Sequence, residues 1–211
     1  MQKCALIKDK LTTLFIMKRI LLFFILIFNS LIIYAEILSD ISDDRKRVIE
    51  TTPVCFATNY DNPKDDYYMS LGYEELYFRN DTISYYYIKT YIYSDKPRIV
   101  PEDSYMLIKT GFDKTVELTS LKELDLLECE PENFNGDIVW KVPVRYLITG
   151  NYIDKVWQDD VKKIRLEIPW NKGYFDIDNS WMRFSFRFEI ADLKLQIDKH
   201  LRNHHSIYEN L

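Results

Sequence analysis

The sequence is poor in glycine and histidine, and each shortage disfavours a class of function. Only five glycines occur among 211 residues, and neither a Gly-rich phosphate loop nor a Gly-x-Ser-x-Gly turn is present. The three histidines, His200, His204 and His205, all lie near the carboxyl end, so none stands in a strand region where it could activate a serine or cysteine. Histidine-dependent catalysis is therefore disfavoured, whereas a carboxylate or tyrosine mechanism stays open.

The few histidines give little sign of a metal site. His200 and His204 are four residues apart and could share a metal on a continuous helix, but no Glu or Cys stands at a matching spacing. A solvated tail is the simpler interpretation of these histidines. We therefore predict no metal, no cofactor and no catalytic residue.

The chain lacks a large cationic cluster, which argues against nucleic acid as a partner. Its 28 basic and 33 acidic residues give a net charge of −5. The first 35 residues hold five of the bases and one acid, so the remainder has 23 bases, 32 acids and a net charge of −9. An acidic chain repels phosphate backbones unless its cations are clustered, and Arg45-Lys46-Arg47 is the largest cluster.

Cysteine is rare as well. Of the three cysteines, Cys4 precedes the predicted end of the leader, which leaves Cys55 and Cys129. A pair of cysteines in an exported protein can oxidise to a disulfide, but two small buried thiols too far apart to bridge would give the same sequence. Both interpretations stay open.

One long hydrophobic run is present, and it predicts export. Lys18 and Arg19 precede an apolar stretch from Ile20 to Tyr34 that ends at Ala35, as in a signal peptide of about residues 17–35. Translation starting at Met17 would fit this better than a start at Met1. The alternative, an uncleaved inner-membrane anchor from Leu11 to Ala35, would place Lys18 and Arg19 within the bilayer at a cost of about 2.5 to 3.5 kcal/mol each near its centre.

The remaining residues predict a mostly β fold with antiparallel strands, either one sheet or a β-sandwich. We expect a lead-in at 36–53, a single β-rich domain at 54–203 and a tail at 204–211. Tyrosine and β-branched residues predict a strand at Thr82–Tyr93. Pro143 restricts the segment Ile138–Ile148 to an edge or a bulge. Further predicted elements are strands at Tyr105–Thr110, Thr115–Leu118, Glu123–Glu128 and Val161–Ile168, a loop at Glu130–Gly136 and a short helix at Asp154–Gln158.

The last third of the chain has conflicting periodicities. Residues 181–190 alternate apolar and polar side chains as a half-buried strand does, whereas Phe186, Ile190, Leu193, Ile197 and Leu201 have helical spacing. We predict strand to about residue 188 and a C-terminal helix from Ile190 to Asn203.

Three strand segments resemble a group of small secreted proteins from Bacteroidota. They are Met106–Thr110, Thr115–Ser120 and Val161–Glu167, which are similar to the "LLIK", "VIEL" and "KIRIE" strands of that group, and Tyr146–Ile148 stands where its tyrosine-containing strand lies. The resemblance covers roughly residues 82–201. It implies a compact antiparallel β domain exported by a bacterium with two membranes, and it carries over no activity and no functional residue.

The tyrosine-rich segment from Tyr60 to Tyr93 is the best candidate for a binding surface, because it holds ten of the sixteen tyrosines. Tyrosine offers apolar area and a hydroxyl at low entropic cost. We therefore expect a non-enzymatic domain of the periplasm or the secreted fraction that binds an envelope protein or a glycan through a face containing Tyr85 and Tyr87. The alternatives are a carboxylate-based hydrolase and a purely structural envelope protein. The membrane is expected as a partner only if the signal segment stays uncleaved.

Overall fold

The fold is described from a computed structural model. The chain divides into two compact units, Met1–Tyr34 and Ala35–Leu211, and the structure describes residues 36–58, 66–79, 81–111, 114–121, 126–134, 136–148, 161–178 and 186–208. All of these belong to the second unit, which is mostly β, as predicted. No helix in this part of the chain is long and apolar enough to cross a membrane.

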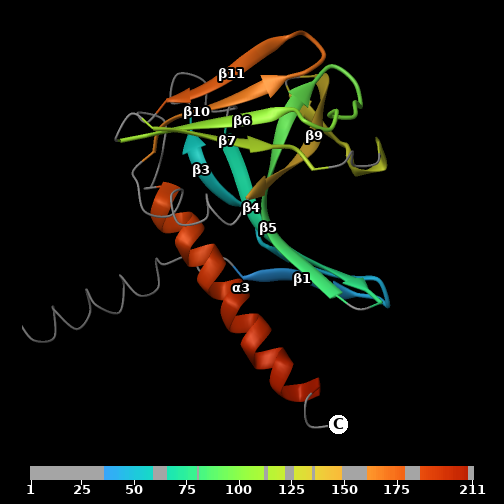
Figure 1. Cartoon of the computed structure of the whole chain (residues 1–211). Helices are drawn as coiled ribbons and strands as arrows, with labels where there is room; N and C mark the ends of the chain where they lie inside the picture. The colour runs from blue at the N-terminus through green and yellow to red at the C-terminus, as the bar shows by residue number, and fades with distance from the viewer. Residues whose placement is uncertain are drawn as a thin grey trace, which may run out of the picture. The chain divides into compact units, whose positions relative to one another are not determined.

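The described residues form two antiparallel sheets, one long helix and one turn of 3-10 helix (Figure 1). The elements are β1 (Ile37–Ser42), β2 (Lys46–Thr51), β3 (Val54–Thr58), β4 (Asp66–Phe78), β5 (Asp81–Ser94), β6 (Tyr105–Thr110), β7 (Thr115–Thr119), η1 (Leu126–Glu128), β8 (Glu130–Phe134), β9 (Asp137–Ile148), β10 (Val161–Ile168), β11 (Gly173–Asp178) and α3 (Phe186–Tyr208).

Sheet A has the strand order β1-β2-β4-β5-β9-β8, and β3 also pairs with β4. Sheet B has the order β11-β10-β6-β7. A bridge between Ser120 and Tyr146 joins the end of β7 to β9, so the two sheets curl into a half-barrel. The strands β4 and β5 are the longest, and their far ends continue beyond the half-barrel to pair beside β1 and β2 (Figure 1).

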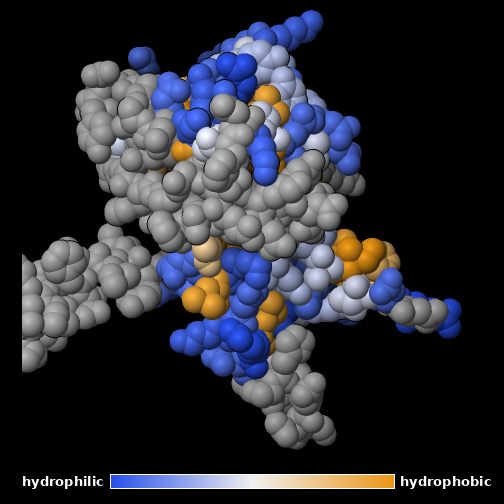
Figure 2. Space-filling view, turned by 60° about the vertical axis from the view of Figure 1, so that its left-hand side comes forward, coloured by the Kyte–Doolittle hydropathy of each residue, from blue (hydrophilic) through white to orange (hydrophobic). Residues whose placement is uncertain are grey.

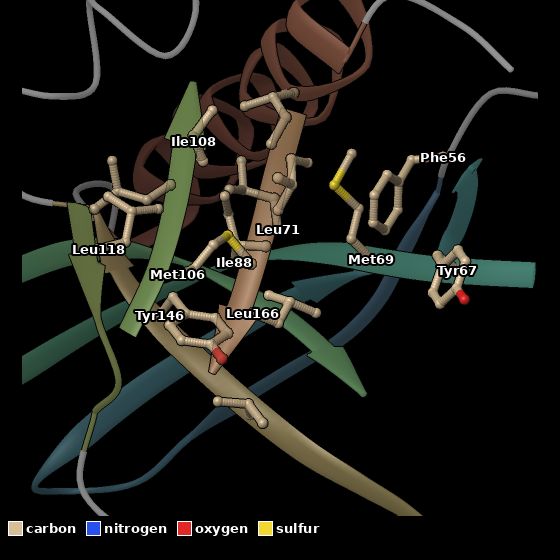
Figure 3. Packing of buried hydrophobic residues seen from close by; sticks show 14 of the residues in the cluster. Phe56, Tyr67, Met69, Leu71, Ile88, Met106, Ile108, Leu118, Tyr146 and Leu166 are labelled. Carbon is tan, nitrogen blue, oxygen red and sulfur yellow. The ribbon is translucent and has the colours of Figure 1, made fainter. Parts of the chain in front are cut away.

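The hydrophobic core lies between the sheets and under α3. Every second residue of the strands points inward, so Leu71 and Ile88 of sheet A share the core with Ile108 and Leu166 of sheet B (Figure 3). The helix adds Ile190, Leu193 and Ile197, each at most 1% exposed. We call the sheet A face that packs on this core and on α3 the inner face, and the opposite one the outer face.

Two predictions about strands of sheet A are corrected. Residues 37–51, predicted as part of a lead-in, form β1 and β2, because Ile49 and Thr51 are buried on the inner face. Residues 130–134, predicted as loop, form β8, which pairs with β9 as an outer strand despite Pro131. The turn between β8 and β9 needs the positive φ of Gly136, whose N–H donates to the Asn133 side chain.

The prediction that Pro143 restricts the segment Ile138–Ile148 to an edge or a bulge is wrong for the strand as a whole, because β9 lies between β5 and β8 and pairs with β5 without a bulge. The strand β9 pairs with β5 along one side, while β8 covers its other side only as far as Lys141 and Ser120 meets it at Tyr146. Pro143 lies between those two partners, where a missing N–H costs no ladder hydrogen bond.

The carboxyl-terminal conflict is resolved in favour of helix. The helix α3 begins at Phe186, so the strand predicted to reach residue 188 is wrong for residues 186–188, and residues 181–185 lie outside the described part. The helix also continues past Asn203 to Tyr208, into the predicted tail. Of the predicted strand 123–128, residues 126–128 form η1 instead. The predicted helix at Asp154–Gln158 lies outside the described residues.

Candidate functional site

The predicted binding residues Tyr85 and Tyr87 lie on the outer face of sheet A. Alternation along β5 places both there, but Tyr87 is fully buried and Tyr85 is half-buried. The expectation that Tyr87 belongs to an exposed aromatic surface is therefore wrong. The reason is its neighbour in the register: Tyr87 lies opposite Gly72 of β4, and Gly72 lies opposite Glu50 of β2.

Gly72 lets the Tyr87 ring cross β4. A Cβ on residue 72 would lie 2.0 Å from Cζ of Tyr87, so the ring occupies the space that a side chain would fill. The Tyr87 hydroxyl then donates to Oε1 of Glu50 at 2.7 Å. Gly72 thus allows a hydrogen bond between β5 and β2 that crosses β4, and this role could not be recognised from the sequence alone.

Two cations complete an outer polar cluster, formed by Glu50, Tyr87, Lys89, Arg145 and Glu128. Nζ of Lys89 lies 3.1 Å from Oε2 of Glu50. Nη2 of Arg145 lies 3.5 Å from Oε1 of Glu50 and 3.7 Å from Oε2 of Glu128, and its guanidinium lies 5.3 Å from the centre of the Tyr87 ring. The cluster therefore ties η1 to β2, β5 and β9.

The surroundings of Glu50 in this cluster lower its pKa and so favour its ionised form. Burial raises the pKa of Glu50, but the positive charge of Lys89 and hydrogen bonds from Tyr87 and Lys89 outweigh it, and the pKa is lowered. Burial raises the pKa of Tyr87, and the adjacent carboxylate adds to that rise. A carboxylate fully engaged by cations and a hydroxyl that keeps its proton form a stabilising network and offer no free acid or base.

A pair of aromatic residues lies on the outer surface of sheet B, opposite the core. Tyr105 of β6 and Tyr174 of β11 both flank Glu167 of β10, and Oε2 of Glu167 accepts the backbone N–H of Tyr105 at 3.2 Å. The two hydroxyls are 2.9 Å apart and the ring centres 6.0 Å apart. Tyr174 is 53% exposed. We call Tyr105 and Tyr174 the tyrosine pair.

Charged residues lie on the same surface beside the tyrosine pair. Arg165 makes a two-point ion pair with Asp176, at 2.6 and 2.8 Å, and its guanidinium lies 5.2 Å from the centre of the Tyr174 ring. Lys163 lies 2.9 Å from the same carboxylate. Hydrogen bonding from Arg165 lowers the pKa of Asp176 to about 2, and the bond to Tyr174 raises the pKa of Tyr105 to about 12.

This surface combines ring area, donors and acceptors on a rigid sheet. Tyr105 keeps its proton at neutral pH, and Asp176 keeps its charge. The residues are fixed by the register of three strands, so a ligand would meet a preformed set of groups. The sequence signal for it was weak, because Tyr105 and Tyr174 are 69 residues apart and only the pairing of β10 with both neighbours brings them together.

The carboxyl groups give little support to hydrolytic chemistry. Five described carboxyl groups have a pKa clearly away from the ordinary value, and in all five it is lowered: Asp40, Asp43, Glu50, Asp95 and Asp176. A general acid working near neutral pH needs a raised pKa instead. Among the residues that the structure describes, no group of three or more His, Cys, Asp or Glu side chains could hold a metal ion.

His200 contributes to packing of the helix. Its Nε2 lies 2.8 Å from Oδ2 of Asp40 on β1, and the same carboxylate accepts two hydrogen bonds from Arg47, at 2.9 and 2.7 Å. The side chain of His204 lies outside the described residues. Arg47, the last member of the basic trio, is thus buried in an ion pair and adds little to a cationic surface.

The two cysteines of the second unit are free thiols. Sγ of Cys55 lies 3.4 Å from the Ala57 carbonyl oxygen, and Sγ of Cys129 lies 3.3 Å from the Arg98 carbonyl oxygen. Each thiol therefore has its own partner, and the disulfide that the sequence left open is not formed in the structure.

Comparison of the chain with protein-family models, with curated proteins and with solved structures finds no match. Function is therefore inferred from the geometry of the two outer surfaces.

Proposed function

We propose that the protein is an exported, non-enzymatic binding domain of the bacterial cell envelope, and that it holds a neutral glycan on the outer surface of sheet B. The observation that carries this proposal is the tyrosine pair: two tyrosines fixed by a shared hydrogen bond, one of them more than half exposed. Aromatic rings offer apolar area to the C–H faces of sugars, and their hydroxyls bind sugar hydroxyls.

The charges around the tyrosine pair favour a neutral ligand. Arg165 and Lys163 are already paired with Asp176, and Glu167 adds a further negative charge beside the rings. An acidic glycan would meet cations that are already neutralised, whereas a neutral one needs only hydrogen bonds and ring contact. A polar, preformed strand surface also suits a ligand with many hydroxyl groups better than it suits an apolar ligand.

Binding is tested with protein purified from the periplasm of a bacterium that expresses the full chain, and N-terminal sequencing is expected to find Glu36 first. The purified protein is applied to an array of neutral and acidic oligosaccharides, and affinity for the strongest neutral ligand is then measured by calorimetry. Tyr174→Ala is expected to weaken binding at least tenfold, which corresponds to about 1.4 kcal/mol.

Tyr68→Ala is the matched control, because Tyr68 is 38% exposed on the outer face of sheet A and is not part of the tyrosine pair. It should leave the affinity unchanged. If no oligosaccharide binds, or if both alanine variants bind as tightly as the wild type, the proposal is wrong, and a purely structural role in the envelope becomes the better hypothesis.

A further inference from the structure

The strand β11 is the last strand of sheet B, and in the described part of the chain no strand pairs with its other edge. In Figure 1 it lies at the top of the domain, beyond β10. Every second residue of an edge strand directs its N–H and C=O groups away from the sheet, and these groups can pair with a strand of another chain. The free edge of β11 can therefore accept one more strand.

Other strands at the sheet edges have features that hinder such pairing. The strand β8 contains Pro131, which lacks an N–H. The strand β1 has a register shift between Ile37 and Ser39 and contacts α3, and the end of β7 is joined to β9 by the bridge between Ser120 and Tyr146. By contrast, β11 contains no proline and pairs with β10 at six consecutive positions without a shift. Its edge is therefore regular enough to pair along its whole length.

The surroundings of β11 are polar and carry charges of both signs. Figure 2 shows mainly hydrophilic atoms at the top of the molecule, where β11 lies in Figure 1. The chain after Ala35 has a net charge of −9, but the β10–β11 hairpin, residues 161–178, has a net charge of +1. Its four bases and three acids are Lys162, Lys163, Arg165, Lys172, Glu167, Asp176 and Asp178. Two copies that meet at this hairpin therefore meet without a local excess of negative charge.

The sequence of β11 and of the residue before it is self-complementary. When two copies run antiparallel with Phe175 opposite Phe175, opposing residues lie on the same face of the joined sheet. The opposing pairs are then Lys172 with Asp178, Gly173 with Ile177, and Tyr174 with Asp176. Opposite charges thus face each other at both ends, where Lys172 is exposed and the Asp178 side chain is 55% exposed. A register centred on Asp176 or Ile177 would instead place acids opposite acids, which is unfavourable.

We propose that β11 pairs antiparallel with β11 of a second copy of this chain, about a two-fold axis that passes through Phe175 perpendicular to the sheet. The four strands of sheet B in each copy then form one sheet of eight strands. Phe175 is half-buried and its ring centre lies 4.8 Å from that of Tyr67, so the two Phe175 rings cover the surface that each leaves exposed. The two tyrosine pairs lie on the same face of the joined sheet.

Self-association is tested by sedimentation velocity over a range of concentrations, without glycan, on protein produced from the full chain. The wild type is expected to sediment as a dimer that dissociates on dilution. Phe175→Lys should weaken the dimer at least tenfold, because it places two cations at the axis. Phe78→Lys is the matched control, because Phe78 is 55% exposed on β4 of sheet A, and it should not change the dimer.

Strand pairing itself is tested by hydrogen exchange followed by NMR at low and high protein concentration. The amides of alternate β11 residues should exchange more slowly at high concentration, because they then donate to the second copy. The amides of β1, which is also an edge strand, should exchange equally at both concentrations. This measurement uses the wild type, so it decides the question even if Phe175→Lys fails to fold.

The register is tested with Lys172→Asn and Asp178→Asn. Asparagine tolerates the positive φ of residue 172. Each variant should weaken the dimer several-fold, and the double variant should weaken it no more than either single one, because all three lose the same ion pair. Lys114→Asn, at an exposed lysine next to β7, is the matched control and should leave the dimer unchanged.

Four outcomes would overturn the proposal. They are a monomer at every concentration, a folded Phe175→Lys variant that dimerises like the wild type, β11 amides that exchange equally at both concentrations, and additive losses in the double asparagine variant. Self-association is measured without glycan, so it stands or fails separately from the proposed glycan binding.

Discussion

At the scale of single residues, Gly72 has the most specific role. Its missing side chain gives the Tyr87 ring its place, and through that ring Glu50 of β2 is joined to β5. The outer polar cluster thus depends on the absence of a side chain at one position in the middle of a strand. A glycine within a strand costs stability by itself, so here the cost is offset by a packing arrangement that no other residue permits.

Gly72→Ala should lower the free energy of unfolding by about 1 to 3 kcal/mol, because the added Cβ forces the buried Tyr87 ring to move. Urea unfolding measures the change. In a Tyr87→Ala background the ring is gone, and the same substitution should cost much less or even stabilise the strand. Equal costs in the two backgrounds would show that the contact does not govern residue 72.

At the scale of elements, α3 is positioned by its apolar face and by polar contacts at its edges. Ile190, Leu193 and Ile197 pack on the inner face. Tyr86 of β5 donates to Asp198, and His200 meets Asp40 of β1. A long helix therefore covers the inner face of sheet A where sheet B does not, in contact with β1, β2 and β4.

Replacing Ile197 should reveal how much this packing stabilises the fold. The side chain is fully buried, so Ile197→Ala is expected to lower the free energy of unfolding by about 2 to 5 kcal/mol. Leu195→Ala, on the same helix but 58% exposed, should change it by less than about 0.5 kcal/mol. Similar losses in the two variants would contradict the described orientation of α3.

Elements with one strong local signal were predictable, and elements defined by their partners were not. The composition of Thr82–Tyr93 fixes a strand, and the spacing of Ile190 to Leu201 fixes a helix. The short strands β1 and β8 mix polar and apolar residues and give little local signal, since pairing with β2 and β9 decides them. The same limit applies to the surfaces: the tyrosine pair needs β6, β10 and β11 together, and Tyr87 is buried because of a glycine on another strand.

At the scale of the whole molecule, several of its acidic side chains form ion pairs with basic side chains on a different strand. Asp40 pairs with Arg47 between β1 and β2, Asp176 pairs with Arg165 between β11 and β10, and Glu50 pairs with Lys89 between β2 and β5. In all three pairs the pKa of the carboxyl group is lowered. The hydrogen bond from Arg47 lowers the pKa of Asp40 to about 2, and the hydrogen bond from Arg165 lowers the pKa of Asp176 to about 2. Burial raises the pKa of Glu50, but its cationic and hydrogen-bonding partners outweigh burial and the pKa is lowered. Each pair therefore stabilises the fold only while its acid is ionised.

Stability should consequently fall in acid within a defined window. The unfolded chain takes up protons on these aspartates near the ordinary pKa of 3.8, whereas the folded chain resists protonation until about pH 2. Between these values the unfolded state binds more protons, so the free energy of unfolding decreases as the pH falls. Urea midpoints measured from pH 6 to pH 2 should decline most below pH 4. Asp40→Asn and Asp176→Asn together should lower the midpoint at pH 6 and flatten the decline; an unchanged slope would mean that other carboxyl groups govern acid unfolding.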